Sequence, residues 1–375
     1  MMKSKTATIP TVLFLSVITM LVSCGKQKSG WKGIIEEVDG VTIIKNPKEP
    51  VYSDNAVSLE EELSIGEAEA RKEYMFSQIG NIAVDDEENI YVLDRKESHI
   101  KVFDKQGEYS RTFGKKGQGP GEFNFPSGIL ITPQNEIMVT DSHVLHFFTL
   151  QGEFIKSLSA AKIQFFGRTN MDSQSSIYVM SGTINMEKGT SIYELNKFDP
   201  SLNFLNTVAS IPGPEAGKPF DPFIPVFYWK IGENDNIIYG YQKNYEFLVF
   251  NPEGKLIKKI VKEHTPVKIK EEEKEESPGD SLPPLKYALS GFYSAFFTFS
   301  LDEEGRIIVQ TWQKTEDREG YYYDVFDPEG RYIAQTSFKF RPQIWKKHKL
   351  YTVEEDEEGF QMVKRYRVTW KYRQI

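Results

Sequence analysis

The feature that most constrains the fold is a unit of four short apolar runs separated by polar turns. Residues 79–114 read IGNIAVDDEENIYVLDRKESHIKVFDKQGEYSRTFG. The runs IAV, IYVL, IKVF and YSRTF contain residues that favour a pleated, half-buried surface, and the turns contain Asp, Asn and Gly. Each run is too short for a stable helix and alternates rather than repeating every 3.6 residues. The stretch therefore predicts a four-stranded antiparallel meander.

The same unit returns along the chain. Its second strand, NIYVLD, recurs as EIMVTD, SIYVMS, NIIYGY and RIIVQT, and its last turn recurs as Phe-Asp-Pro-Glu-Gly or a close variant. The five copies are anchored on Ile90, Ile137, Ile177, Ile237 and Ile307. One meander cannot bury both of its faces, so a series of copies predicts a repeat architecture in which neighbouring sheets cover one another.

A sixth unit is divided between the two ends of the chain. KLYTVEED and QMVKRYRVTW predict two strands, but the sequence stops at Ile375 without an outer one. Near the N-terminus, Glu62–Gly66 resembles the outer-strand segment Ser110–Gly114. We therefore expect a ring closed by an N-terminal strand, because closure removes the free sheet edges that promote aggregation. The early strand at Gly40–Pro47 is expected to pack on this closing blade.

A family resemblance follows from these units. Residues 121–158, GEFNFPSGILITPQNEIMVTDSHVLHFFTLQGEFIKSL, resemble an NHL repeat, and so do residues 79–114. The segment that usually reads N-x-R-I is Glu97-Ser-His-Ile100 in the first copy. The whole chain resembles the six-bladed β-propeller lipoproteins of bacterial envelopes. The resemblance implies an all-β propeller of four-stranded antiparallel blades over residues 57–375, and it implies no function, because propellers host many.

The N-terminus predicts a lipid anchor. Residues 1–23 combine two lysines with an apolar run too short to span a bilayer, which is typical of a secretory leader. The leader ends in Leu-Val-Ser before Cys24, which resembles a bacterial lipobox, in which the cysteine thiol is acylated. Cys24 is the single cysteine, so the fold contains no disulfide. We expect residues 24–56 to form a tether and early strand, and the protein to be lipid-anchored in the cell envelope, at the outer membrane, its periplasmic side or the cell surface.

Charge limits the partners. The net charge is −8, and removing the leader with Lys3 and Lys5 makes it −10. A negative protein argues against a nucleic-acid partner, because phosphate contact needs basic surface. Pro266–Pro284 is charged and contains no aromatic residue, so we expect a solvated loop between the fourth and fifth units, with partner docking as the alternative. We expect the protein to be a monomer.

No motif predicts a catalytic centre, a cofactor or a metal. H-x-x-x-H, C-x-x-C and G-x-S-x-G do not occur, and Gly117–Gly121 lacks the Gly-Lys-Ser of a phosphate loop. A metal shared between His99 and His143 of adjacent units is a hypothesis, and surface histidines are the alternative.

The repeat symmetry predicts a ligand site in the channel of the ring. Because the first strand of each blade lines the axis, counting nine residues back from the anchors gives one level of positions: Asn81, Gly128, Arg168, Tyr228 and Thr298. The loops after the second strands would form the mouth at the same end: Asp94, Arg95, Asp141, Gln242, Lys243 and Trp312. We expect Tyr228, Trp229 and Trp312 to stack on a sugar or another ring. The alternative is that the aspartates cap turns and the aromatic rings pack between blades.

Arg168 is the charged residue of the axial level. A guanidinium that lines a narrow channel is costly unless it is paired. It should therefore either pair with Asp94 or Asp141 or bind an anionic ligand through two hydrogen bonds.

Two classes of function fit this sequence. The first is a binding or scaffold lipoprotein whose funnel or top loops take a glycan, a peptide or a partner protein. The second is an enzyme, because calcium-dependent lactonases and NHL-type lyases also have six-bladed propellers. The lactonases need a Glu and several Asn or Asp facing the axis, and the axial level here contains no carboxylate. We therefore favour binding.

Overall fold

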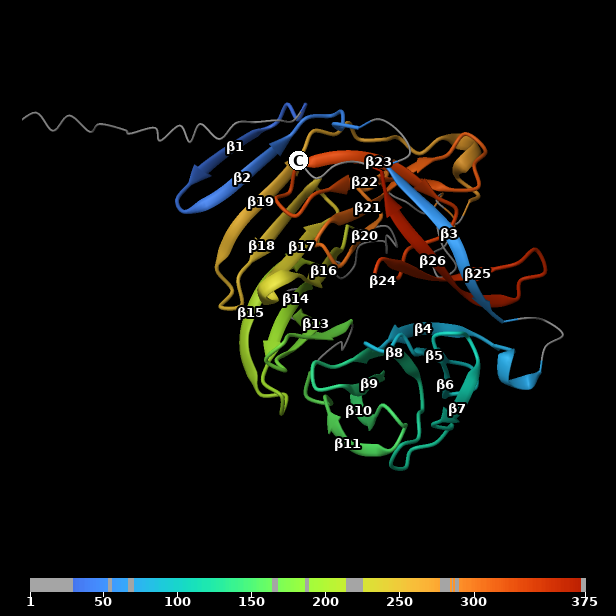
Figure 1. The fold of residues 1–375 in the computed structure, drawn as a ribbon. Helices are drawn as coiled ribbons and strands as arrows, with labels where there is room; N and C mark the ends of the chain where they lie inside the picture. The colour runs from blue at the N-terminus through green and yellow to red at the C-terminus, as the bar shows by residue number, and fades with distance from the viewer. Residues whose placement is uncertain are drawn as a thin grey trace, which may run out of the picture. The chain divides into compact units, whose positions relative to one another are not determined.

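The chain folds into six antiparallel sheets arranged as blades in a ring (Figure 1). The structure, a computed structural model, describes residues 30–52, 56–66, 71–163, 168–185, 189–213, 225–276, 284, 286 and 290–371. The expected leader and Cys24 lie outside the described residues. The described helices are three-residue turns, η1 (Lys72–Tyr74), η2 (Glu233–Asp235) and η3 (Glu271–Glu273), and none is long or apolar enough to span a membrane.

Each of the first five blades is one sequence repeat, and its strands run in chain order from the axis to the rim. Blade 1 contains β4 (Ile79–Val84), β5 (Ile90–Asp94), β6 (His99–Phe103) and β7 (Tyr109–Phe113). Blade 2 contains β8 (Pro126–Ile131), β9 (Glu136–Asp141), β10 (Val144–Thr149) and β11 (Phe154–Ser159). Blade 3 contains β12 (Thr169–Met171), β13 (Ile177–Asn185), β14 (Thr190–Phe198) and β15 (Phe204–Pro212). Blade 4 contains β16 (Phe227–Ile231), β17 (Ile237–Tyr241), β18 (Glu246–Phe250) and β19 (Leu256–Lys262). Blade 5 contains β20 (Thr298–Leu301), β21 (Ile307–Lys314), β22 (Tyr321–Phe326) and β23 (Tyr332–Phe338).

Blade 6 joins the two ends of the chain. Its inner strands are β24 (Ile344–Lys346), β25 (Lys349–Glu355) and β26 (Gln361–Trp370), and its outer strand is β3 (Val57–Ile65). β3 pairs antiparallel with β26 along its whole length, from Val57 opposite Trp370 to Ile65 opposite Val363. The prediction that an N-terminal strand closes the ring is confirmed.

The early strand lies elsewhere than expected. β1 (Ile34–Val38) and β2 (Val41–Asn46) form a hairpin, and β2 runs parallel to β19, so it extends blade 4 rather than the closing blade. The Asn46 side chain explains this position. Its Oδ1 accepts hydrogen bonds from the Trp31 indole at 3.0 Å and the Tyr332 amide at 2.6 Å, and its Nδ2 donates to the Gly330 carbonyl at 2.9 Å. The hairpin is therefore fixed over the seam between blades 4 and 5.

The repeated turns owe their sequence to a local hydrogen-bond pattern. In blade 1, Asp85 Oδ1 accepts the amides of Glu87 and Asn89, both at 2.9 Å. Asp104, Asp172, Asp199, Asp327 and Asp356 open equivalent turns in which the carboxylate accepts the amide four residues later. This bonding satisfies backbone donors that the turn removes from the ladder, so aspartate recurs at these positions.

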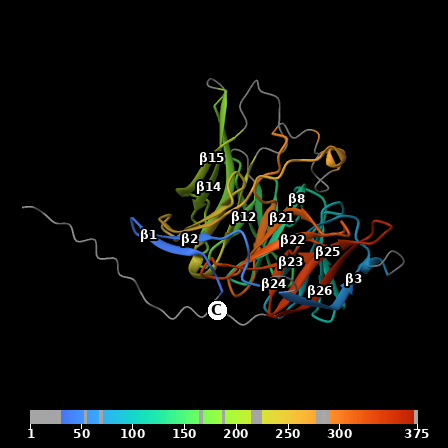
Figure 2. The same ribbon diagram turned by 90° about the horizontal axis from the view of Figure 1, so that it is seen from above.

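Apolar side chains fill the spaces between neighbouring blades. Tyr91 and Leu93 of blade 1 form one cluster with Ile137 and Phe148 of blade 2, and the other seams have similar clusters. In blade 3, β13, β14 and β15 have nine residues each, and β14 and β15 project from one end of the ring (Figure 2). The packing between blades holds the six inner strands around a central channel.

Candidate functional site

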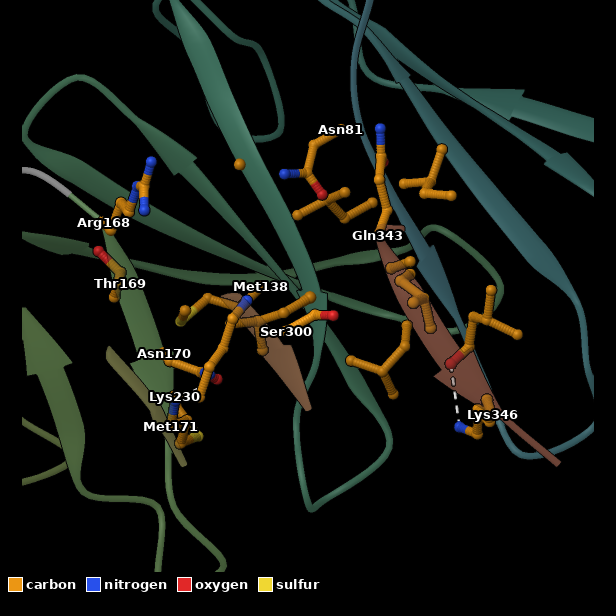
Figure 3. A pocket seen from close by; sticks show the side chains of 18 of the residues that line it. Asn81, Met138, Arg168, Thr169, Asn170, Met171, Lys230, Ser300, Gln343 and Lys346 are labelled. Atoms are coloured by element: carbon orange, nitrogen blue, oxygen red, sulfur yellow. Dashed lines mark hydrogen bonds between the residues drawn. The ribbon is translucent and has the colours of Figure 1, made fainter. Parts of the chain in front are cut away.

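The inner strands β4, β8, β12, β16, β20 and β24 all contribute to a channel with a volume of about 1080 Å³. In Figure 3, Arg168 lies on one side of this channel, and Asn81 and Gln343 lie on the other. The cavity is at the upper end of the size range of ligand sites in proteins. It is therefore large enough for a ligand of several linked rings.

The strand ladders reproduce the predicted axial level. Asn81, Gly128, Tyr228 and Thr298 each pair with the residue three positions after the anchor of their repeat. The Arg168 carbonyl accepts the amide of Met180, which is the equivalent contact in blade 3, at 2.9 Å. All of these residues except Tyr228 line the channel, and Gln343 occupies the same region in blade 6.

The channel lining is strongly cationic, although the chain as a whole is acidic. The charged side chains among the lining residues are Arg168, Lys230, Arg341, Lys346 and Asp86. Four of these five are basic, whereas the full sequence has a net charge of −8. A confined site with charges of one sign concentrates the electrostatic potential, so this channel attracts anions.

Arg168 is held by an aromatic ring rather than by a carboxylate. Its guanidinium carbon lies 4.4 Å from the centre of the Tyr228 ring, which belongs to the next blade. A cation–π contact of this kind holds the guanidinium beside the ring without using its N–H groups as a carboxylate would. Among the described residues, Arg168 has no acidic partner, so the expected pairing with Asp94 or Asp141 is not seen.

Lys230 lies two residues further along β16 and is half-buried. Burial, and then the neighbouring Arg168 charge, lower the pKa of Lys230 to about 8. Within the described part of the chain this ammonium has neither a hydrogen bond nor a salt bridge from its side chain. Within the residues that the structure describes, the two basic groups therefore form a cationic pair without a carboxylate partner.

Arg341 supplies a third cation from the other side of the ring. It precedes β24 of blade 6, and its guanidinium carbon lies 4.9 Å from the centre of the Phe297 ring in the neighbouring blade 5. Like Arg168, it is exposed and has no acidic partner among the described residues. The arrangement repeats that of Arg168 on Tyr228.

Lys346 behaves differently, because it is paired. Its ammonium contacts the Asp86 carboxylate at 2.8 Å and donates to the Val84 carbonyl at 3.0 Å. The hydrogen bond and charge of Lys346 together lower the pKa of Asp86. These contacts join β24 of blade 6 to the end of β4 in blade 1, so we assign Lys346 to the ring-closure seam.

Asp94 and Asp141 cap turns. Asp94 is fully buried, and its carboxylate accepts the amides of Ser77, Gln78 and Glu97. Asp141 accepts the amides of Asn124 and Phe125 at 2.7 and 2.6 Å in the same way. Burial alone would raise the pKa of Asp141, but hydrogen bonds from His146 and these two amides bring its pKa below the usual value. Neither aspartate is among the channel-lining residues.

Two of the other predicted mouth residues, Gln242 and Trp312, are also engaged in packing. Gln242 is buried, accepts the Val226 amide and donates to the carbonyls of Phe296 and Phe297, which makes it the blade 4 equivalent of Asp94. Trp312 stacks on Tyr293 with ring centres 4.7 Å apart.

Arg95, Lys243 and Trp229 have different surroundings. The aliphatic part of the Arg95 side chain covers Gly80, and Lys243 lies exposed in the turn after β17. Trp229 lines the channel but is only 7% exposed, so its ring is largely covered by protein. Among the described residues its indole N–H has no hydrogen-bond partner.

His99 and His143 do not form a shared metal site in the described residues, so the hypothesis of a metal between adjacent blades has no support there. The cluster of potential ligands found there is Glu303, Glu304 and His348, and it contains neither His99 nor His143. The Glu303 carboxylate already accepts the amides of Lys347 and His348, both at 2.6 Å. This cluster thus joins the turns of blades 5 and 6.

Sequence reasoning missed Lys230, Arg341 and Gln343. Lys230 could have been found, because it is the charged residue of an otherwise apolar inner strand, Phe227–Ile231. Arg341 and Gln343 had no such signal, because β24 is only three residues long and the repeat pattern does not reveal it.

Comparison with known proteins agrees with this fold. Residues 61–207 match the family described as DUF5128: 6-bladed beta-propeller. A solved structure of a Bacteroides fragilis protein described as exported has 12% identity and a TM-score of 0.56, and the match covers 88% of this chain and 100% of that one. A DUF4221 family member from Bacteroides vulgatus has 10% identity and a TM-score of 0.51, with 84% and 99% covered.

A third structure is more distant. Virginiamycin B lyase from Staphylococcus aureus has 10% identity and a TM-score of 0.43, with 82% of this chain and 99% of that chain covered. No curated protein matches the sequence. The protein is a six-bladed β-propeller, and at these levels of identity its ligand has to be inferred from the channel itself.

Proposed function

We propose that this protein is a lipid-anchored binding protein of the cell envelope whose propeller channel takes an anionic ligand. Its first two blades are proposed to be NHL-like repeats. The leader and the lipobox-like sequence before Cys24 support an envelope location, and the likeness to a Bacteroides fragilis protein described as exported is consistent with it.

The cation excess of the channel carries the proposal. Arg168, Lys230 and Arg341 line one confined space and have no acidic partner among the described residues. Elsewhere the same chain pairs its buried cations: Lys262 contacts Asp324 at 2.8 Å, and Arg306 contacts Asp302 at 2.5 Å. Of the four basic residues that line the channel, Arg168, Lys230 and Arg341 thus lack such a partner among the described residues and are available to a ligand.

Binding of matched acidic and neutral compounds tests this function. We would titrate the purified mature protein calorimetrically with galacturonate oligomers, acidic peptides and citrate, and with the neutral counterpart of each. At least one anion should bind more tightly than its neutral counterpart, and Arg168→Ala should weaken it by about tenfold or more, the loss expected for a charge-assisted pair. If no anion binds in a way that depends on Arg168, the proposed function is wrong.

The anchor has a separate test. Cys24→Ser removes the thiol that a lipobox cysteine would have acylated, so the variant should leave the membrane fraction or accumulate as the unprocessed precursor. Cell fractionation with a metabolic fatty-acid label measures both effects. A variant that still sediments fully with membranes and is still cleaved before residue 24 would disprove the lipid anchor without affecting the channel.

A further inference from the structure

Two arginines reach the channel from opposite sides of the ring. Arg168 belongs to blade 3 and Arg341 to the start of blade 6, which lie across the ring from each other (Figure 1). Each guanidinium lies over an aromatic ring of an adjacent blade, at 4.4 Å from the Tyr228 ring and 4.9 Å from the Phe297 ring. The two walls therefore each carry an arginine held over an aromatic ring.

An arginine held in this way is suited to binding carboxylates and sulfates. A guanidinium is planar, and its paired N–H groups match two oxygens of one acidic group, while the neighbouring ring limits how far it can move. The two arginines come from opposite walls, and a bidentate pair uses both oxygens of one acidic group, so each arginine needs an acidic group of its own. A ligand that uses both needs acidic groups at two separated positions.

The remaining lining is rich in uncharged polar groups. Asn81, Asn170, Thr298, Ser300 and Gln343 come from blades 1, 3, 5 and 6 and all line the channel. Two buried lining groups also have no hydrogen-bond partner among the described residues, the Trp229 indole N–H and the Gln310 Oε1, in side chains that are 7% and 5% exposed. Donors and acceptors spread over several walls suit a ligand with many hydroxyl groups.

We propose that the ligand is an acidic oligosaccharide with acidic groups on at least two sugar units, one bound by Arg168 and the other by Arg341. This inference rests on the proposed anion-binding function and specifies its ligand. An acidic peptide fits less well, because peptide sites usually offer a free strand edge or apolar pockets for side chains. Here several of the large apolar lining residues, Ile129 and Phe299 among them, are buried in the blades, and others such as Leu130 are partly buried.

Galacturonate oligomers of increasing length provide the test. We would measure the affinity of the intact mature protein for mono-, di- and trigalacturonate, for the neutral galactose trimer and for triglutamate by calorimetry. The trimer should bind about 100-fold more tightly than the monomer, because joining two contacts in one molecule raises the effective concentration of the second. The neutral trimer should bind about 100-fold more weakly than the acidic one, because it loses both charge-assisted contacts.

Variants then test the contribution of each arginine to ligand binding. Arg168→Ala and Arg341→Ala should each weaken trimer binding by about tenfold or more, and the double variant should reduce it to the level of the neutral trimer. Arg71→Ala is the matched control, because Arg71 also lies over a tyrosine ring, 4.9 Å from the centre of Tyr74, but is not among the channel-lining residues. Arg168→Lys and Arg341→Lys keep the charge but lose the planar fork, so they should recover only part of the affinity. Melting curves confirm that each variant is folded.

The possible results distinguish the acidic-oligosaccharide ligand from the more general anion-binding function. If triglutamate binds as tightly as trigalacturonate and depends on both arginines, the channel binds polyanions and the carbohydrate class is wrong. If monogalacturonate binds as tightly as the trimer, the proposal that Arg168 and Arg341 bind two acidic groups of one ligand is wrong. If none of the anions binds, the proposed function fails together with this inference.

Discussion

At the scale of single residues, the channel is distinguished by charges that the fold does not use. Asp324 shows the usual treatment of a buried charge: it accepts hydrogen bonds from Tyr332, Gln335 and Lys262. Lys230 has no such partner among the residues that the structure describes, and its lowered pKa reflects burial and repulsion by Arg168. An unpaired charge of this kind costs stability, which is consistent with a role in binding rather than in folding.

Replacing Lys230 should therefore separate stability from binding. Lys230→Met keeps the length of the side chain and removes the charge, so we expect the free protein to gain about 1–2 kcal/mol at pH 7. The same change should weaken anion binding by about tenfold. Chemical unfolding and calorimetry measure the two effects, with the exposed Lys243→Met as the control. A variant that is less stable and binds normally would contradict this assignment.

The pH dependence of Lys230 gives a second prediction. Its pKa in the folded protein is about 8, below the usual 10.5, so the folded state releases the proton first as the pH rises. The charge lowers stability below pH 8, and that loss should fade between pH 8 and about 10.5. Anion affinity should fall over the same range, because the ligand needs the protonated form. In Lys230→Met both effects should be absent; an unchanged profile would rule out Lys230 as their source.

Asp94 should prove structural. Its carboxylate is fully buried and accepts three backbone amides, so Asp94→Ala leaves these donors without a partner and should cost about 2–4 kcal/mol. Asp104→Ala, at a more exposed turn of the same blade, should cost about 1 kcal/mol or less. Urea denaturation measures both variants. Loss of anion binding in a stable Asp94→Ala protein would instead return Asp94 to the ligand site.

At the scale of strands, the closing strand β3 contributes to the stability of the whole ring. Among the described strands of blade 6, β3 is the one that comes from the N-terminal part of the chain, and its Ile65 is buried against the seam with blade 1. Glu62 on the same strand contacts Arg365 at 3.3 Å and Arg367 at 2.8 Å. Without β3, the long strand β26 would become a free edge.

Deletion of Ser58–Gly66 should consequently destabilise the whole ring, lowering the melting temperature by about 10 °C or more, or preventing folding. Deletion of Glu271–Glu275, an exposed turn between blades 4 and 5, should change the melting temperature little. Differential scanning calorimetry on both proteins and the parent makes the comparison. Equal melting temperatures would show that β3 does not hold the ring together.

The sequence predicted the strands well where the same local pattern repeats. It predicted them less well where contacts between residues far apart in the sequence determine the position of a strand. The five meanders and the closing strand follow from apolar alternation and turn residues, which act locally. The position of β2 does not, because it depends on Asn46 bonding to Gly330 and Tyr332 far along the chain. Arg341 was missed for a similar reason: the short strand β24 is defined by pairing with β25, not by its own pattern.

At the scale of the whole molecule, the ring brings polar residues from successive repeats together in one channel. Each blade contributes one inner strand, so residues from distant parts of the sequence, such as Asn81, Arg168 and Gln343, meet in one channel (Figure 3). The seams hold this arrangement, among them the Lys346–Asp86 contact between the last blade and the first. The charge of the channel is thereby set independently of the acidic outer surface.

The most direct test of an anion-binding channel is a crystal structure of the protein with trigalacturonate. We expect density for the ligand inside the channel, with one carboxylate within hydrogen-bond distance of the Arg168 guanidinium and a second near Arg341. Ligand density on the outer surface of the blades, or an empty channel at a concentration that saturates binding in solution, would show that the channel is not the binding site.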